Sequence, residues 1–327
     1  MKRNILVTGG AGFIGSHLVG RLVADELCEV SIVDNFNRFY APEIKRRNVE
    51  NFLALPNFYL YEADICESAE MRQIFAARKF DAIVHLAAWA GVRPSLENPA
   101  LYVKTNVDGT LNLLELAKEF GVRQFIFGSS SSVYGVNCQV PFTENDKIAR
   151  PISPYAATKA AGELLCHTYA HLYDIRAVCL RFFTVYGARQ RPDLAIHKFS
   201  QLIWQNKPIA MFGDGTTRRD YTYIDDIVSG VCAAINYDRT AYEVINLGES
   251  QTIELKRLIE LLEISLGKKA IIEQHEMQPG DVPLTFADIS KAKKLLNYNP
   301  QTKIEDGIPK FTRWFLENQR SALTESV

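Results

Sequence analysis

The sequence predicts an α/β fold, with a doubly wound parallel sheet and a smaller α/β C-terminal domain. Three observations predict it: apolar runs of strand length alternate with segments of helical periodicity, a glycine-rich turn follows the first run, and glycine and proline interrupt the pattern beyond residue 187. We therefore expect a first domain over 1–186, with return segments near 220–248, and a second, substrate-binding domain mainly over 187–327.

The predicted strands and helices alternate through the first half of the chain. Apolar runs typical of buried strands cover 4–9, 28–34, 57–64, 81–88, 123–129 and 175–183. Segments with the apolar spacing of helices lie between them at 12–25, 69–79 and 105–121. Strands that alternate with helices in this way form parallel βαβ units.

Composition excludes several classes of protein. The 327 residues carry 37 basic and 38 acidic side chains, which leaves no electrostatic footprint for nucleic acid or an anionic membrane. No apolar run is long enough to span a bilayer, and the first ten residues begin a strand, not a signal peptide. Because the six cysteines and six histidines are dispersed, we expect reduced thiols, a cytoplasmic protein and no metal site.

The glycine-rich turn indicates a dinucleotide site. In "LVTGGAGFIGSHL", Gly9, Gly12 and Gly15 stand after a strand and at the start of a helix. Glycines there allow a tight turn and a close approach of the backbone to a pyrophosphate at the helix N-terminus, as in Rossmann-type folds. Read more simply, the glycines only terminate a strand.

Acidic residues end the next two strands. Asp34 can accept hydrogen bonds from a ribose 2′-hydroxyl and would repel a 2′-phosphate, which favours NAD over NADP. The nearby Arg38 keeps NADP open as an alternative. Asp64 could hold the adenine amino group, or be an ordinary turn aspartate.

A tyrosine and a lysine indicate the chemistry. In "SPYAATKAAGELL", Ser153 can cap a helix with Pro154 at its first position, so Tyr155 and Lys159 share one helix face. An ammonium and a nicotinamide cation favour the phenolate, which can take a hydroxyl proton while hydride leaves the same carbon for NAD. Tyr-x-x-x-Lys is common by chance, but here a glycine motif and a serine cluster precede it.

The sequence resembles the extended short-chain dehydrogenase/reductases of the sugar-nucleotide epimerase type, and within them most resembles UDP-glucuronate 4-epimerases. The resemblance covers essentially the whole chain and rests on "TGGAGFIG", "HLAAWAGV", "NVDGTLNLLE", "SSSSVYG", "SPYAATK", "RFFTVYG", "DYTYIDD" and "PGDVP". It implies a tightly bound NAD, oxidation of a UDP-sugar at C4, rotation of the 4-keto intermediate, and return of hydride to the other face, with no net redox change.

The resemblance implies a role for the four consecutive serines at 129–132. Ser130 becomes the third member of a Ser–Tyr–Lys triad that hydrogen bonds the C4 oxygen. The next two positions are typically Asp-Glu in dTDP-glucose 4,6-dehydratases, and the second is Glu in UDP-glucuronate decarboxylases. Ser131 and Ser132 cannot act as carboxylate acid or base, which implies an enzyme that oxidises C4 and stops. A tolerated polar loop is the alternative.

The resemblance also implies further cofactor contacts. It places Ala87, Ala88 and Trp89 in a loop over the cofactor and Asn106 beside it, although Trp89 could be ordinary core. The other implied cofactor-binding residues are Phe13, Ile14, Asn35, Ile65 and Leu86.

A uronate substrate needs hydroxyls and a cation for its C6 carboxylate. The candidates are Arg93, Ser131, Ser132 and Thr184, with Arg191 nearby. Galactose-type epimerases usually carry Asn where this chain has Thr184. Any single arginine could instead be a solvated surface charge.

The C-terminal part is expected to bind UDP. By resemblance, Phe212 flanks the uracil, Arg219 pairs with the diphosphate, and Gln278 and Asp281 match a nucleotide-ribose motif. Many epimerases carry Arg at the position of Gln278, so one diphosphate contact is in doubt here.

The leading interpretation is therefore an NAD-dependent UDP-glucuronate 4-epimerase that makes UDP-galacturonate. The nearest alternative is a UDP-glucose or UDP-N-acetylglucosamine 4-epimerase. Three features discriminate against it, only by resemblance: Thr184, the loop after it that carries Arg189 and Arg191, and Gln278. Ser131 and Ser132 disfavour a decarboxylase or dehydratase. A non-catalytic NAD-binding protein would be expected to lack part of the triad.

Relatives of this type are usually homodimers that pair the Tyr/Lys helix with the helix around 106–120. The apolar positions Leu111, Leu114, Ala161 and Leu165 fit such a four-helix bundle, and fit core packing equally well.

Overall fold

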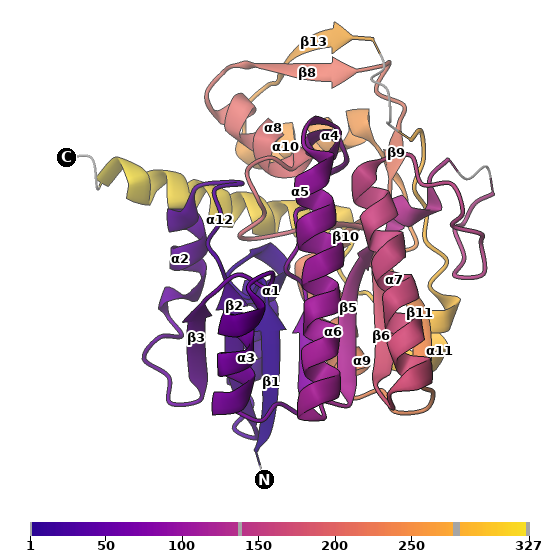
Figure 1. Cartoon of the computed structure of the whole chain (residues 1–327). Helices are drawn as coiled ribbons and strands as arrows, with labels where there is room; N and C mark the ends of the chain where they lie inside the picture. Colours follow the sequence, from indigo (N-terminus) through magenta and orange to yellow (C-terminus); the bar gives the residue numbers. More distant parts are fainter. Residues whose placement is uncertain (1, 137–138, 277–281, 325–327) are drawn as a thin grey trace.

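The computed structural model describes residues 2–136, 139–276 and 282–324 (Figure 1). Within these residues the main sheet has seven parallel strands, in the order β11-β6-β5-β4-β1-β2-β3. The strands are β1 (Arg3–Thr8), β2 (Cys28–Asp34), β3 (Phe58–Glu62), β4 (Ala82–His85), β5 (Gln124–Ser130), β6 (Arg176–Phe182) and β11 (Tyr242–Leu247). The predicted doubly wound parallel sheet is confirmed.

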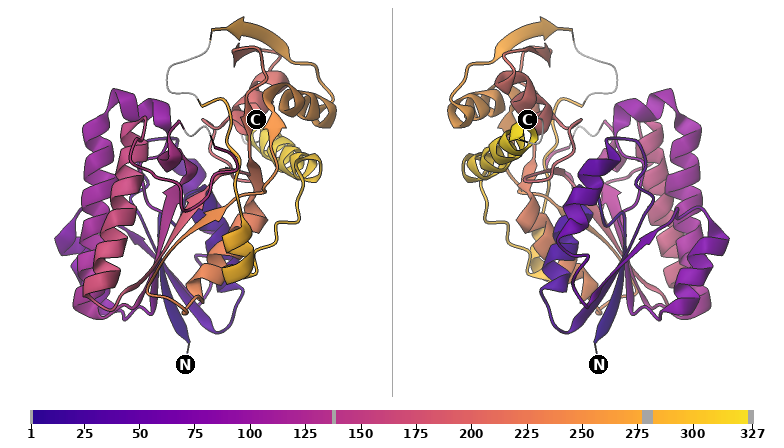
Figure 2. Two further views of the ribbon diagram at one scale, coloured as in Figure 1. Left: turned by 90° about the vertical axis from the view of Figure 1, so that its right-hand side faces the viewer. Right: turned by 90° about the vertical axis from the view of Figure 1, so that its left-hand side faces the viewer.

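Helices cover both faces of this sheet (Figure 2). One layer holds α1 (Phe13–Val23), α2 (Pro42–Glu50), α9 (Ile224–Ile235) and α11 (Ser290–Leu296). In this layer α1 contacts both α2 and α9, and α9 also contacts α11. The other holds α3 (Ser68–Ala77), α6 (Gly109–Phe120) and α7 (Pro154–Leu172) side by side. Burial on both faces explains why the strands read as continuous apolar runs without alternation.

The direction of winding reverses between β1 and β4, because the chain leaves β1 toward β2 and β3 and returns to build β4, β5 and β6 on the other side. Ligands of open α/β sheets bind at such a switch point, outside the carboxyl ends of the strands. The glycine turn after β1 and the loop after β4 both lie there. Short helices α4 (Val92–Glu97) and α5 (Pro99–Val103) follow that loop, and a π-helical turn (Lys104–Asp108) leads into α6.

A smaller lobe lies beyond the carboxyl ends of the strands (Figure 1). Its helices α8 (Ala195–Trp204), α10 (Leu255–Leu266) and α12 (Ile304–Thr324) pack together. Three two-stranded pairs accompany them: β7 (Thr184–Tyr186) with β10 (Tyr221–Tyr223), β8 (Pro208–Phe212) with β13 (Ile271–His275), and β9 (Arg218–Arg219) with β12 (Ile253–Glu254). Between these elements the chain returns to the large sheet as α9 and β11.

Helix α7 packs unusually close to β5. A Cβ atom built on Gly162 would lie 2.3 Å from Cζ of the Phe127 ring, which is only 1% exposed. The helix starts as the sequence predicts: the Ser153 hydroxyl accepts a hydrogen bond from the Ala156 amide (3.1 Å), and Pro154 occupies the first turn. Gly162 therefore sets how near α7 can approach the sheet.

We predict that Gly162→Ala destabilises the protein by about 1–3 kcal/mol, because the buried Phe127 ring has no room to move aside. The better helix propensity of Ala, about 1 kcal/mol, offsets only part of this cost. Urea unfolding would measure the difference. As a control, Arg257→Ala at an exposed ion pair on α10 should change stability by less than about 0.5 kcal/mol. A Gly162→Ala protein as stable as the parent would contradict the close packing.

Candidate active site

A cavity of about 390 Å³ lies at the carboxyl ends of the strands, where the loops that follow β1 to β6 line it together with Arg191 and Leu194. Next to it is a second cavity of about 190 Å³, and Val92, Ser131, Ser132 and Thr184 line both. Many residues that the sequence singles out line the larger cavity: Gly9, Gly12, Phe13, Ile14, Gly15, Asp34, Asn35, Asp64, Ile65, Leu86, Ala87, Ala88, Ser130, Ser131, Ser132, Tyr155, Lys159, Thr184 and Arg191.

The glycine turn forms one end of this cavity. Gly9 has a left-handed φ of 69°, and a Cβ on it would lie 2.7 Å from the Ala87 amide nitrogen. A Cβ on Gly15 would lie 2.2 Å from the Gly9 carbonyl oxygen. Only glycine fits at either position, and the turn thereby presents bare backbone at the start of α1. This arrangement suits an anionic group such as a pyrophosphate.

Asp34 ends β2 beside this turn. Its two carboxylate oxygens accept hydrogen bonds from the amides of Ala11 (3.1 Å) and Phe36 (2.9 Å), which fixes the orientation of the side chain. Burial raises the pKa of Asp34, and the ammonium of Lys45 opposes this effect. Asn35, the residue after Asp34, donates to Asp64, which follows the neighbouring strand β3 (2.8 Å).

Sequence reasoning missed one wall of the cavity. The loop after β2 and the start of α2 contribute Asn37, Phe39, Tyr40 and Lys45. The buried Lys45 ammonium donates to the backbone and side-chain oxygens of Asn37, both at 2.9 Å. Their position after a predicted strand could have identified them, because loops at the carboxyl edge of a parallel sheet line its ligand site. Nothing in the helical spacing around Lys45 distinguishes it from a surface lysine.

Aromatic rings join this wall to the loop after β4. Phe39 meets Trp89 edge to face at 5.3 Å, and Trp89 lies 6.3 Å from Tyr102. The Arg191 guanidinium sits over the Phe39 ring at 5.1 Å and donates to both carboxylate oxygens of Asp193, at 3.0 and 2.8 Å. Arg191 thus presents an oriented charge to the cavity.

The residues of the predicted triad meet deeper in the same cavity. Tyr155 and Lys159 lie one turn apart on α7, and Ser130 ends β5. Burial raises the pKa of the Tyr155 phenol, while the Ser130 hydroxyl hydrogen bonded to it and the Arg191 guanidinium lower that pKa. The Lys159 ammonium donates to the Gly128 carbonyl (2.7 Å), and burial lowers its pKa to about 8.

The four serines divide between two environments. Ser129 is buried and donates to Glu163 at 2.6 Å. The Ser130 hydroxyl contacts the Ser132 hydroxyl and accepts from the Ser132 amide, both at 3.2 Å. A 3₁₀ turn (Ser131–Tyr134) then carries Ser131 and Ser132 to the cavity wall. The run therefore ends the strand on hydroxyls that face a ligand space.

Asn106 is placed behind this cavity and is not among the described residues that line it. Within the π-helical turn, its side chain donates to the Trp89 carbonyl (2.9 Å) and to the Thr158 hydroxyl (3.0 Å), and it accepts from the Trp89 amide (2.9 Å). Asn106 thus ties the loop after β4 to α7, and Trp89 is held in that loop.

The remaining substrate candidates are less concentrated. Arg93 lies over the Phe212 ring at 5.2 Å, joining α4 to β8, and neither is among the described residues that line the two cavities. Arg219 lines the smaller cavity. Gln278 and Asp281 lie outside the described residues.

A chain of hydrogen bonds runs behind the triad through a buried histidine. His85 contacts the Thr8 hydroxyl through Nδ1 (2.7 Å) and the Thr110 hydroxyl through Nε2 (3.0 Å). Because Thr110 donates to the Asn106 carbonyl (2.6 Å), its oxygen accepts from Nε2–H, and Nδ1 accepts from Thr8. His85 is therefore neutral, and burial, together with the charge of Lys159, lowers its pKa to about 3.

Metal binding and membrane insertion are not supported by the described ranges, 2–136, 139–276 and 282–324. No cluster of three or more His, Cys, Asp or Glu side chains there could hold a metal ion. Within the same ranges, no helix combines the length and apolarity needed to cross a membrane.

Comparison with known proteins identifies the family. The profile described as GDP-mannose 4,6 dehydratase matches residues 6–311. The chain belongs to this family. Its resemblance to the sugar-nucleotide epimerases among the extended short-chain dehydrogenase/reductases is confirmed.

Individual family members are similar to this chain over nearly its full length. The UDP-glucuronate 4-epimerase of Thermodesulfobacterium geofontis is 46% identical over 314 residues, 96% of either chain. The crystal structure of UDP-glucuronic acid 4-epimerase from Bacillus cereus with UDP-glucuronic acid and NAD superposes with a TM-score of 0.91 at 38% identity, covering 96% of this chain and 99% of that one. UDP-glucose 4-epimerase from Thermotoga maritima with UDP-glucose gives 0.89 at 34% identity, covering 97% and 99%.

The buried His85 generates a prediction about stability. Its pKa falls from 6.5 to about 3 on folding, so between these values the unfolded chain binds a proton that the folded protein does not. Stability is then lost as pH falls through this window, by about 2 kcal/mol from this residue at pH 5. Urea unfolding of the parent and of His85→Asn at pH 7.5 and pH 5 would measure it.

The variant should lose less stability than the parent on acidification, because it lacks His85. It should still lose some, because His17 and His197, whose pKa values burial also lowers, remain in both proteins. Equal losses in the two proteins would show that His85 is charged in the folded state.

Proposed function

We propose that this protein is an NAD-dependent UDP-glucuronate 4-epimerase that interconverts UDP-glucuronate and UDP-galacturonate. One observation carries the proposal: a single cavity joins the glycine turn, the Ser130–Tyr155–Lys159 set, and the hydroxyls that follow Ser130. Two relatives at 46% and 38% identity carry this activity in their names, and the latter was crystallised with UDP-glucuronic acid and NAD.

The residues at the first end of the cavity fit NAD. The turn has no room for side chains at Gly9 and Gly15, as close approach of a pyrophosphate requires. In this proposal Asp34 accepts from a ribose hydroxyl and Asp64 faces the adenine. The cofactor contacts come from the 1–186 domain, with Asn106 acting through the loop that it holds. When bound, NAD accepts hydride from C4 of the sugar and returns it.

Tyr155 then handles the proton. Its phenolate takes the proton of the C4 hydroxyl as the sugar is oxidised and gives it back on reduction, so no net proton is released. Ser130 hydrogen bonds the same C4 oxygen. Lys159, protonated below a pH of about 8, supplies positive charge on the same helix face. Burial raises the pKa of the Tyr155 phenol, and the Ser130 hydroxyl and the Arg191 guanidinium oppose this rise.

The uronate carboxylate creates a chemical hazard. Once C4 is a ketone, the sugar is a β-keto acid, and it loses CO₂ if the bond to the carboxylate aligns with the carbonyl π system. Ser131, Ser132 and Thr184 line one wall, and Arg191 lies in the same cavity. We propose that these groups hold the carboxylate away from that alignment by charge-assisted hydrogen bonds. Since Arg93 lies over Phe212, Arg191 is the better cation for this role.

The UDP group extends into the smaller cavity in this proposal. Arg219 lines it beside Ser131, Ser132 and Thr184, and is assigned to the diphosphate. Phe212 lines neither cavity, so its assignment to the uracil, like that of Gln278 and Asp281 to the nucleotide ribose, rests on the resemblance alone. The 187–327 domain supplies Arg219, Val282 and Thr285 to this cavity, and the other described residues that line it belong to 1–186.

We also propose that the protein is a homodimer of the cytoplasm. Leu111 on α6 and Leu164 and Leu172 on α7 are 38%, 66% and 57% exposed, which leaves apolar surface on two adjacent helices. Leu114 is fully buried, so it belongs to the core and not to this face. The five cysteines within the described residues are free thiols, which suits a reducing compartment.

The proposal predicts that the purified protein converts UDP-glucuronate to UDP-galacturonate without added reductant and with little pentose product. UDP-glucose should react with a kcat/KM lower by about tenfold or more, because it lacks the carboxylate that would bind to Arg191 and the hydroxyls of the cavity wall. NMR of the nucleotide sugars would measure both reactions, with Tyr155→Phe as the inactive control. Preferred turnover of UDP-glucose would instead make the protein a neutral-sugar epimerase, and UDP-xylose as the main product would overturn the roles of Ser131 and Ser132.

The proposed carboxylate-binding role of Thr184 and Arg191 can be tested by substitution. Thr184→Ala or Arg191→Ala should weaken uronate binding about tenfold, the loss expected for one charge-assisted hydrogen bond, and should release CO₂ during turnover. Labelled CO₂ from UDP-[6-¹³C]glucuronate would be counted by NMR. Binding of UDP-glucose serves as the matched control and should change little for Thr184→Ala. No extra CO₂ together with unchanged uronate affinity would remove these residues from the role.

A further inference from the structure

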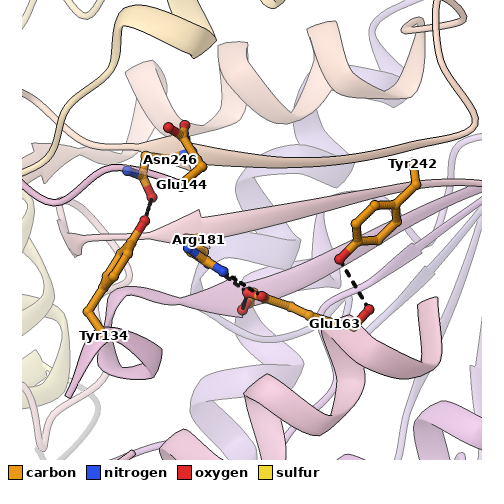
Figure 3. A network of polar contacts seen from close by, with 7 residues as sticks. Tyr134, Glu144, Glu163, Arg181, Tyr242 and Asn246 are labelled. Atoms are coloured by element: carbon orange, nitrogen blue, oxygen red, sulfur yellow. Dashed lines mark hydrogen bonds and ion pairs between the residues drawn. The ribbon is translucent and has the colours of Figure 1, made fainter. Parts of the chain in front are cut away.

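A buried ion pair joins α7 to β6 (Figure 3). Glu163 on α7 and Arg181 on β6 each have side chains that are 3% exposed. Arg181 donates to both carboxylate oxygens, from Nε to Oε1 at 2.9 Å and from Nη2 to Oε2 at 2.7 Å. The proposed reaction uses neither residue, since both are placed outside the cavity lining.

Glu163 completes a row of three contacts between α7 and β5. Tyr155, Lys159 and Glu163 are spaced four residues apart, so they share one face of α7. At the end of β5, Tyr155 meets Ser130, Lys159 donates to the Gly128 carbonyl (2.7 Å), and Glu163 accepts from Ser129 (2.6 Å). The three partners are consecutive residues. A shift of α7 along β5 would break all three contacts together.

Arg181 connects this row to the other side of the site. Its guanidinium lies 4.7 Å over the ring of Tyr134, the last residue of the turn that carries Ser131 and Ser132. The Tyr134 hydroxyl donates to Asn246 on β11 (2.6 Å), and the Tyr242 hydroxyl of the same strand donates to the Glu163 carbonyl (3.2 Å). Figure 3 shows these side chains converging from α7, β6, β11 and the turn.

Stability alone does not account for such a pair. Moving two charges out of water costs several kcal/mol per ion, and well-packed apolar residues often serve as well or better. What an apolar pair cannot supply is a fixed direction of hydrogen bonding and a negative charge one helical turn from Lys159. Both properties act on the triad.

We propose that Glu163, held by Arg181, is a positioning residue for the triad: it fixes the register of α7 on β5 and keeps a negative charge facing the Lys159 ammonium. This inference rests on the proposed function only in taking the triad as the reacting group.

The charged and titratable groups around Lys159 are few. Burial is the main influence and lowers its pKa to about 8, while Cys166 and Glu163 raise it. Those facing this region are Tyr155, Glu163 and Cys166 on α7, His85 on β4, Cys179 and Arg181 on β6, and Tyr242 on β11. Of these, His85 is neutral, and Glu163 is the one carboxylate among the described groups.

The test measures the pKa of Lys159 directly. Protein labelled with [¹³Cε]lysine would be titrated by NMR, with the Lys159 signal assigned from Lys159→Met. In Glu163→Gln the Arg181 charge is left uncompensated, so the pKa of Lys159 should fall by about one unit. In Arg181→Met the carboxylate is left alone, and the pKa should rise. Removing both charges, in Glu163→Gln with Arg181→Met, should return it to within about half a unit of the parent.

Controls separate this result from loss of stability. Glu260→Gln removes a carboxylate from an exposed ion pair with Arg257 on α10 and should leave the pKa of Lys159 unchanged. A merely structural brace predicts lower unfolding temperatures for the Glu163 and Arg181 variants with one common Lys159 pKa, and that outcome overturns the electrostatic part. If one single variant fails to fold, the other still separates the two readings, because a shift in the pKa of Lys159 is expected only if the charges of the pair act on it.

Kinetics tests the register. A second paired variant, Glu163→Leu with Arg181→Met, keeps the net charge but removes the acceptor for the Ser129 hydroxyl. In this variant kcat for epimerisation should fall about tenfold with little change in KM, as for a misaligned but occupied site. The parent's kcat in this second paired variant would overturn the positioning claim. Since the titration needs no substrate, a parent that converts no UDP-sugar would contradict the proposed function and leave this inference to be decided by NMR.

Discussion

The contact between helix α7 and strand β5 is the constraint on which the site depends. Gly162 lets the helix come close enough for Tyr155 and Lys159 to reach the end of β5, where Ser130, Ser131 and Ser132 emerge. A bulkier residue at 162 would move the phenol away from the serines, since the Phe127 ring beneath it is fully packed. The packing of α7 on β5 therefore also sets the positions of the candidate catalytic side chains.

Much of this arrangement can be predicted from local patterns. The βα alternation gives the parallel sheet, the glycines need a turn that only glycine can make, and Ser153–Pro154 starts α7 where its cap requires. Each of these signals lies within a few consecutive residues. They identify the strands, the turn and the helix face, and they bring most of the singled-out residues to one cavity.

The rest depends on partners far apart in the sequence. Phe39 and Lys45 reach the cavity because β2 ends beside β1, and Arg93 lies over Phe212 because the smaller lobe folds across α4. The bond from Ser129 to Glu163 and the stacking of Arg181 on Tyr134 likewise need the register of α7, β5 and β6. A serine or an arginine carries no local mark of such a partner, so these contacts cannot be read from spacing or composition.

The return of the chain as β11 has a consequence for how the protein can be divided. β11 pairs with β6 along its whole length, from Tyr242 with Ala177 to Leu247 with Phe182. A fragment that stopped at residue 186 would leave β6 as a bare edge, with unpaired backbone groups open to association with other chains. The fragment would also lack α9, which covers α1. We therefore expect that residues 1–186 do not fold on their own, and that synthesis must proceed well into the second half of the chain before the sheet is complete.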